Sequence, residues 1–208
     1  MYFGFFLVVA LAKGAIAAST FTTQFGGGER SGGNIFEIVA KTKPIAVIGL
    51  SINIDNGTGS IKIEARPGPG RDVDLNDDGW ILVNTFPGVI GEGRNKLTSL
   101  PDFDAPVIIY EGSKLTFYVT ANLDNAPRSI WCSMGSSLGS VYASNDDLEV
   151  VEGYSTESDN GDITLTYPRI WNGAIRYSVF DDHLTSSTVS TKEPVDIHKV
   201  HNRACSLR

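Results

Sequence analysis

Hydrophobic and polar residues alternate along most of the central part of the chain. A period of two places the apolar side chains of an extended segment on one face, so each alternating segment predicts a half-buried β-strand. The alternating apolar positions are Ile48, Leu50, Ile52 and Ile54; Ile61, Ile63 and Ala65; Leu115, Phe117 and Val119; and Ile163, Leu165 and Tyr167. The pattern predicts an all-β chain.

Turn-forming residues separate the predicted strands. They are Asp55-Asn56-Gly57, Pro67-Gly68-Pro69-Gly70, Asp78-Gly79, Glu111-Gly112 and Asn160-Gly161. Glycine permits positive φ angles, proline fixes φ, and Asn and Asp bond to their own backbone, so each cluster favours a turn. About nine or ten short strands, each with one polar face, predict an antiparallel two-sheet β-sandwich of immunoglobulin-like or jelly-roll type.

The two ends of the chain differ from this alternating centre. Residues 18–33 are rich in Gly, Ser and Thr, a composition that favours turns over regular structure, so we expect the β-sandwich domain to span residues 34–179. Residues 180–208 are polar and lack the alternation, which predicts a disordered tail.

Residues 1–17 have the pattern of a signal peptide. An apolar run over residues 2–12 is followed by Ala15 and Ala17, the small residues expected before a cleavage point. The run ends at Lys13 and is shorter than the roughly 20 apolar residues of a transmembrane helix, so a stable membrane span is the less favoured alternative. We expect the chain to be secreted and extracellular.

Composition supports the prediction of an all-β fold and narrows the class of partner. The 208 residues include 22 glycines and only two methionines, which favours a turn-rich β protein. The net charge is -7 and Lys and Arg form no cluster, so nucleic acid is not an expected partner. Cations and neutral ligands fit this chain better.

Residues 72–79 carry side-chain oxygens at every second position. Calcium takes several oxygen ligands, and Asp72, Asp74, Asn76 and Asp78 are spaced to curl around one ion. The twelfth position counted from Asp74 holds a threonine in place of the bidentate glutamate of an EF-hand, which excludes that motif. We predict a weak calcium site, and the alternative is a solvated acidic hairpin turn.

No recognisable active site emerges, and we expect a non-catalytic protein. Residues 135–139, GSSLG, match the pattern of a serine-hydrolase nucleophile elbow, but that elbow joins a strand to a helix, and the sequence here predicts a β connection. The three histidines, His183, His198 and His201, lie in the predicted tail, where nothing would hold a base or a zinc ligand rigidly. Four clustered carboxylates are interpreted as solvated surface groups: Asp146, Asp147, Glu149 and Glu152.

Two further features depend on export. Cys132 and Cys205 would be able to pair in an oxidising compartment and staple the tail to the domain, and two free thiols are the slightly favoured alternative. Asn56-Gly57-Thr58 is an N-glycosylation sequon in a predicted hairpin turn, so Asn56 is the expected glycan acceptor in a eukaryotic source.

Several segments resemble the motifs of a known domain family. They are residues 33–40 (GNIFEIVA) and 168–177 (PRIWNGAIRY) at the two ends, and 79–82 (GWIL), 116–120 (TFYVT) and 141–149 (VYASNDDLE) between them. The family is an extracellular β-sandwich domain found in secreted proteins of diatoms and related algae and in bacterial surface proteins. The resemblance implies an extracellular location and a sandwich fold, and it implies no particular activity.

The end motifs also allow a structural interpretation. Phe36, Trp171 and Tyr177 are expected to be core aromatics. Asn34 and Asn172-Gly173 are expected in turns or bulges where φ is positive.

The sequence as a whole predicts a secreted, non-catalytic binding or structural module of matrix or adhesion type, stabilised by calcium if residues 72–79 bind it. An extracellular glycan or a matrix protein is the expected partner. The alternative is a carbohydrate-binding module or a carbohydrate-active enzyme, with Tyr142 or Tyr154 lining a groove. Two facing carboxylates in a cleft would favour the enzyme, and a flat surface with stacked aromatics would favour sugar binding.

Overall fold

The computed structural model describes residues 17–23, 25–75, 78–124, 128–159 and 162–180. These residues form strands and one 3-10 turn, η1 (Gly70–Asp72), with no α-helix among them. The strands build two antiparallel sheets, so the predicted all-β sandwich is confirmed. In this described part of the chain, no helix is long and apolar enough to cross a membrane.

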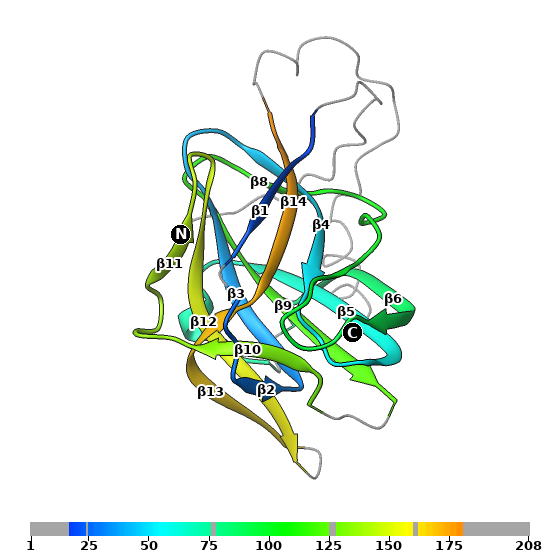
Figure 1. Ribbon diagram of the computed structural model, residues 1–208. Coiled ribbons are helices and arrows are strands. Elements are labelled where there is room, and N and C mark those ends of the chain that lie inside the picture. Colours follow the sequence, from blue (N-terminus) through cyan, green and yellow to red (C-terminus); the bar gives the residue numbers. More distant parts are fainter. Residues whose placement is uncertain (1–16, 24, 76–77, 125–127, 160–161, 181–208) are drawn as a thin grey trace, which may run out of the picture.

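The smaller sheet joins the two ends of the domain (Figure 1). Its strand order is β1-β14-β4-β7, and β8 also pairs with β4. The strands are β1 (Ser19–Thr22), β14 (Gly173–Val179), β4 (Ile45–Ile52), β7 (Thr98–Ser99) and β8 (Val107–Ile109). Strand β14, the last in the described part of the chain, therefore lies between β1 and β4.

The larger sheet has nine strands and is strongly curled. Its order is β2-β10-β13-β12-β3-β9-β5-β6, with β11 paired to β12. The strands are β2 (Glu29–Ser31), β10 (Ile130–Met134), β13 (Asp162–Trp171), β12 (Leu148–Asp159), β3 (Gly33–Ala40), β9 (Lys114–Leu123), β5 (Gly57–Pro67), β6 (Ile81–Gly91) and β11 (Val141–Ser144).

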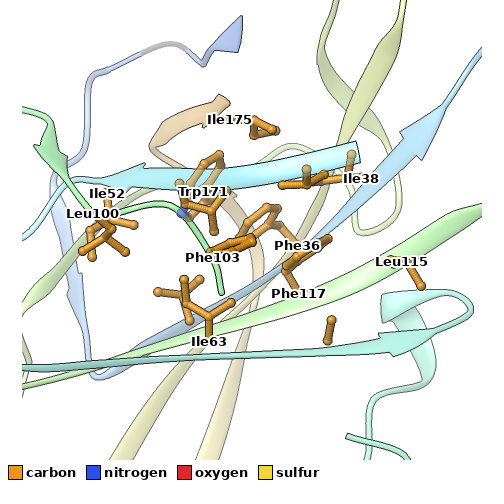
Figure 2. Packing of buried hydrophobic residues seen from close by; sticks show 14 of the residues in the cluster. Phe36, Ile38, Ile52, Ile63, Leu100, Phe103, Leu115, Phe117, Trp171 and Ile175 are labelled. Carbon is orange, nitrogen blue, oxygen red and sulfur yellow. The ribbon is translucent and has the colours of Figure 1, made fainter. Parts of the chain in front are cut away.

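The main core fills the space between the sheets. Its residues come from both sheets, and Figure 2 shows Phe36, Ile63 and Phe117 of the larger sheet packed beside Ile52 and Ile175 of the smaller one. The predicted alternation is confirmed in β5, where the three apolar positions are buried and the charged residues between them are not. Burial of such apolar surface is the dominant favourable term in folding.

The centre of the core is an aromatic stack. The rings of Phe36 and Trp171 lie 4.2 Å apart at 8°, and Phe117 stacks on Phe36 at 5.9 Å (Figure 2). Phe36, Trp171 and Tyr177 are all buried, so their prediction as core aromatics is confirmed.

Only Asn172 separates β13 from β14, and the chain changes sheet at this point. Asn172 is buried and bonded to the Ser133 hydroxyl at 3.1 Å. Gly173 Cα faces the Trp171 ring, and a Cβ there would also lie 2.5 Å from the Ser51 carbonyl oxygen, so only glycine fits. The buried Thr23 hydroxyl donates to the Gly173 carbonyl at 3.1 Å and so ties the corner to the N-terminal strand.

Strand β3, at the centre of the larger sheet, carries two buried polar residues, Asn34 and Glu37, each of which has a polar partner. The buried Asn34 donates its side-chain amide to the Tyr154 carbonyl at 2.7 Å. Glu37, also buried, accepts the Gly70 N–H at 2.7 Å and lies 3.2 Å from Lys114 Nζ. These contacts bind β3 to β12 and to η1.

Three expectations about local structure are wrong. Residues 18–33, expected to be irregular, contain β1 and β2, which are too short to show a period and are fixed by pairing with β14 and β10. Asn34 lies in β3, and neither it nor Asn172 or Gly173 has positive φ: among the described non-glycine residues, only Asn95 does. Position 173 requires glycine because a Cβ there would clash with its neighbours, and not because of its φ angle.

The apolar face predicted for β13 is also wrong. Ile163 and Tyr167 are 51% and 61% exposed, because this part of β13 pairs with β12 in a hairpin and turns these side chains to the outside of the sheet. The predicted tail lies outside the described residues from 181 onward, as does the predicted signal peptide up to residue 16.

Candidate functional site

A groove of about 430 Å³ lies on the outer face of the larger sheet. Strands β5 and β9 form much of it, and the residues of these strands that line it alternate with core residues, so they point away from the core. The lining residues are Lys62, Glu64, Leu75, Trp80, Tyr118, Thr120 and Ile163. A concave site that combines aromatic and apolar surface with a few polar groups is the usual form of a binding site.

Gly33 of β3 makes room for the Tyr118 side chain. A Cβ at position 33 would lie 2.7 Å from Tyr118 Cε2 and would also clash with the Thr156 hydroxyl. The Tyr118 and Thr156 hydroxyls are hydrogen-bonded at 3.1 Å across this position. Burial raises the pKa of Tyr118, against a smaller lowering by the Thr156 hydrogen bond, so the phenol stays protonated at neutral pH.

The connection between η1 and β6 forms one wall of the groove. Val73, Leu75 and Trp80 pack against a second, smaller apolar cluster on the outer face of the sheet. The Trp80 indole N–H donates to the Asp74 carbonyl at 3.1 Å, which holds the two ends of the connection together. This cover also explains why Tyr118 of β9 is buried, although alternation predicts a polar face there. Thr116 of the same strand is buried beneath the preceding turn, where its hydroxyl donates to the Gly68 carbonyl at 2.8 Å.

The same packing accounts for the exposure of Asp74. Val73 and Leu75 turn toward the sheet, so Asp74 between them is turned to solvent and is exposed. A polar residue between two packed apolar ones fits an extended segment that is covered on one side.

The predicted calcium ligands are only partly described. Asn76 lies outside the described residues, and of Asp72 only the backbone, in η1, is described. Asp78 is exposed in the turn before Trp80. Among the described residues, no three His, Cys, Asp or Glu side chains converge on a point that would hold a metal ion. Calcium binding therefore stays a prediction.

We expect millimolar calcium to raise the melting temperature of the exported form, since an ion that binds only the folded state stabilises it by mass action. The expected affinity is weak, roughly 10⁻⁴ to 10⁻³ M, for a site without a bidentate glutamate. Melting curves with calcium and with magnesium measure the effect. The double variant Asp74→Ala, Asp78→Ala should melt as the parent does without calcium and lose the calcium response; an equal response in both proteins would exclude this site.

Charged side chains lie along the rim of the groove. Lys62 Nζ and Glu64 Oε1 lie 2.8 Å apart. The Arg66 guanidinium lies over the Trp80 ring at 5.7 Å, a cation–π contact. The Tyr118 ring contacts the Trp80 ring in a tilted geometry, with 5.6 Å between centroids. The contacts fix the aromatic wall in place.

The clustered carboxylates do not all lie at the surface as expected. Glu152 is buried, and its carboxylate accepts the backbone N–H groups of Ser136 and Ser137 at 2.7 and 2.8 Å and the Ser136 hydroxyl at 2.9 Å. Its role is to close the loop of residues 135–139. That loop joins strands β10 and β11, as the sequence predicted, and no described helix follows it.

The aromatic residues named for a groove are the wrong ones. Tyr154 is buried and donates its hydroxyl to the Arg71 carbonyl at 2.7 Å, and the Tyr142 hydroxyl donates to the Trp171 carbonyl at 2.7 Å. Neither lines the groove, whose aromatic residues are Trp80 and Tyr118. Tyr118 lies in a predicted strand and Trp80 in one of the segments that resemble the known domain family, and neither was assigned to a site.

A second aromatic feature lies where β2 meets β10. The guanidinium groups of Arg30 and Arg94 lie 5.4 and 4.5 Å from the centre of the Trp131 ring. Asp55 accepts from both Arg30 and the Trp131 indole N–H, and Arg94 donates to the Gly27 carbonyl. These groups are engaged with one another, so we interpret the cluster as structural.

Asn56 is exposed in the bend before β5, so the predicted glycan acceptor is sterically accessible.

Cys132 is fully buried in β10, and Cys205 lies outside the described residues. Burial raises the pKa of the Cys132 thiol from 9.0 to about 11, so very little thiolate exists at neutral pH.

We expect Cys132 to resist thiol reagents in the folded protein, because only an exposed thiolate reacts quickly. Alkylation followed by mass spectrometry should find Cys132 modified only after the protein has been unfolded.

The fold favours the neutral form of the Cys132 thiol. The stability that the buried thiol contributes is therefore complete below pH 9.0 and is lost as pH rises through about 11. Unfolded, unreduced protein should show two free thiols; none would indicate the Cys132–Cys205 disulfide.

No protein-family model and no curated protein matches the chain. The assignment of a function therefore depends on the groove and on the sequence.

Proposed function

We propose that the chain is a secreted, non-catalytic binding module whose contact surface is the groove formed by β5, β9 and the neighbouring residues Leu75 and Trp80. The single observation that carries the proposal is the groove itself: it combines the Trp80 side chain with the Tyr118 ring and the Thr120 hydroxyl of β9. An extracellular glycan or a matrix protein is the proposed class of partner. The signal-peptide pattern of residues 1–17 supports an extracellular role, and the acidic net charge makes nucleic acid an unexpected partner.

A two-carboxylate hydrolase is the competing function. Such enzymes place a second carboxyl group on the opposite side of the scissile bond. Glu64 supplies the one carboxylate among the described lining residues, and it is paired with Lys62. This arrangement favours binding over hydrolysis.

The test is a binding screen of the exported form against glycan arrays and immobilised matrix proteins, with and without calcium. Ile163→Asp, which places a charge in the groove, should weaken binding about tenfold. Val141→Asp is the matched control, because Val141 is 48% exposed and lies on β11, outside the groove. Binding that is lost equally in both variants, or in neither, would remove the groove from the proposed function.

A further inference from the structure

We infer that the ligand of the groove is an uncharged carbohydrate chain, an assignment that rests on the proposed function and adds the chemical class of the ligand. The argument depends on three properties of the lining residues: their charge, their apolar surface, and the state of the backbone beneath them.

The charges of the residues that line the groove are balanced, and a further cation, Arg66, lies over the Trp80 ring. The lining contains one cation and one anion, Lys62 and Glu64, which are paired at 2.8 Å with the Glu64 side chain largely covered. A charged ligand would have to break this pair and would gain one attraction at the cost of another. A ligand without charge leaves the ion pair intact and can form hydrogen bonds with polar groups on the rim of the groove.

The apolar and hydroxyl groups are interleaved. Trp80, Leu75, Ile163 and the Tyr118 ring offer apolar surface, whereas Thr120 brings a hydroxyl that can both donate and accept. The Tyr118 hydroxyl is engaged with Thr156. A pyranose ring has the same character, because its C–H bonds form apolar faces and its hydroxyls project from the ring edge. Tyr and Trp carry a polar O–H or N–H group on an apolar ring, so they suit ligands that have one apolar face and one hydrated face.

The backbone beneath the groove excludes the common mode of peptide binding. Peptides that bind sheets usually add a strand at a free edge, where main-chain groups are unpaired. Strand β5 is paired with β6 and β9 on its two sides, and β9 is paired with β3 and β5. A peptide lying over this face would bury its own amides against side chains, at a cost for each unpaired group.

The ligand class is tested by titrating the isotope-labelled exported form with four neutral hexasaccharides, the β-1,4-glucan, β-1,3-glucan, xylan and mannan oligomers, and with an acidic galacturonate hexasaccharide. We expect at least one neutral oligomer to shift the Trp80 indole and Thr120 amide resonances at concentrations up to about 10 mM, and to bind at least tenfold more tightly than the acidic one. Thr120→Val and Ile163→Asp should each weaken binding about tenfold. Val141→Asp should leave it unchanged.

Three results would overturn the inference. They are tighter binding of the acidic oligomer, shifts that map to a surface away from Trp80 and Thr120, and no shift with any neutral oligomer. A matrix protein that binds in the screen and loses binding with Ile163→Asp, but not with Val141→Asp, would keep the proposed function and reject the carbohydrate. The two conclusions are thus separable.

Discussion

Replacing Trp171 with alanine should cost about 3–5 kcal/mol of unfolding free energy, the usual range for removing a buried tryptophan. Trp171 lies at the centre of the core, stacked on Phe36 at 4.2 Å, and it begins the corner at which the chain changes sheet (Figure 2). The cavity would open where both sheets meet. Because native domains are stable by about 5–15 kcal/mol, this variant should be at or near the limit of folding.

Trp171→Phe is the matched control. Among the described residues, no group accepts a hydrogen bond from the buried Trp171 indole N–H, so a phenyl ring loses no such bond and keeps the stack with Phe36. Urea denaturation should give a loss clearly smaller than that of alanine. A loss below about 1 kcal/mol for Trp171→Ala would mean that this stack does not organise the core.

Replacing Glu152 with alanine should cost about 3 kcal/mol, because it leaves two backbone N–H groups and one hydroxyl of the loop without their acceptor. The three hydrogen bonds measure 2.7, 2.8 and 2.9 Å, and the carboxylate is 3% exposed. Urea denaturation measures the loss, and hydrogen exchange should show faster opening of residues 135–139.

Two further variants distinguish the stability that comes from the hydrogen bonds of Glu152 from that of its charge and from the general effect of a substitution in β12. Glu152→Gln keeps a carbonyl oxygen for the two N–H groups and should lose less than alanine. Glu149→Ala removes a half-buried carboxylate from the same strand, β12, and should change stability by less than about 0.5 kcal/mol. Equal losses in Glu152→Ala and Glu149→Ala would show that the loop does not depend on Glu152.

The fold class followed from the sequence where each strand has one solvated face. The positions Ile61, Ile63 and Ala65 of β5 are the clearest case, with buried side chains separated by charged ones. The prediction failed where another segment covers the second face, as over Tyr118, or where no sheet covers the first, as at Ile163. Period alone carries no information on what packs against a strand.

The candidate site was less accessible to sequence reasoning. The spacing of Asp72 to Asp78 directed attention to the correct connection, yet the described groove uses the apolar Leu75 and the following Trp80. The other lining residues lie on β5, β9 and β13, and they meet only through the register of the sheet and its curl. Register is set by tertiary packing, so a single sequence leaves it open.

The position of β14 between β1 and β4 determines the order in which the protein can fold. Ser19 pairs with Tyr177, and Thr23 bonds to Gly173, so the N-terminal strand has no partner until the end of the domain is available. Folding dominated by such distant pairings is slow, on the order of milliseconds to seconds. A chain still being synthesised or translocated therefore holds β1 unpaired until residues 173–179 are available to pair with it.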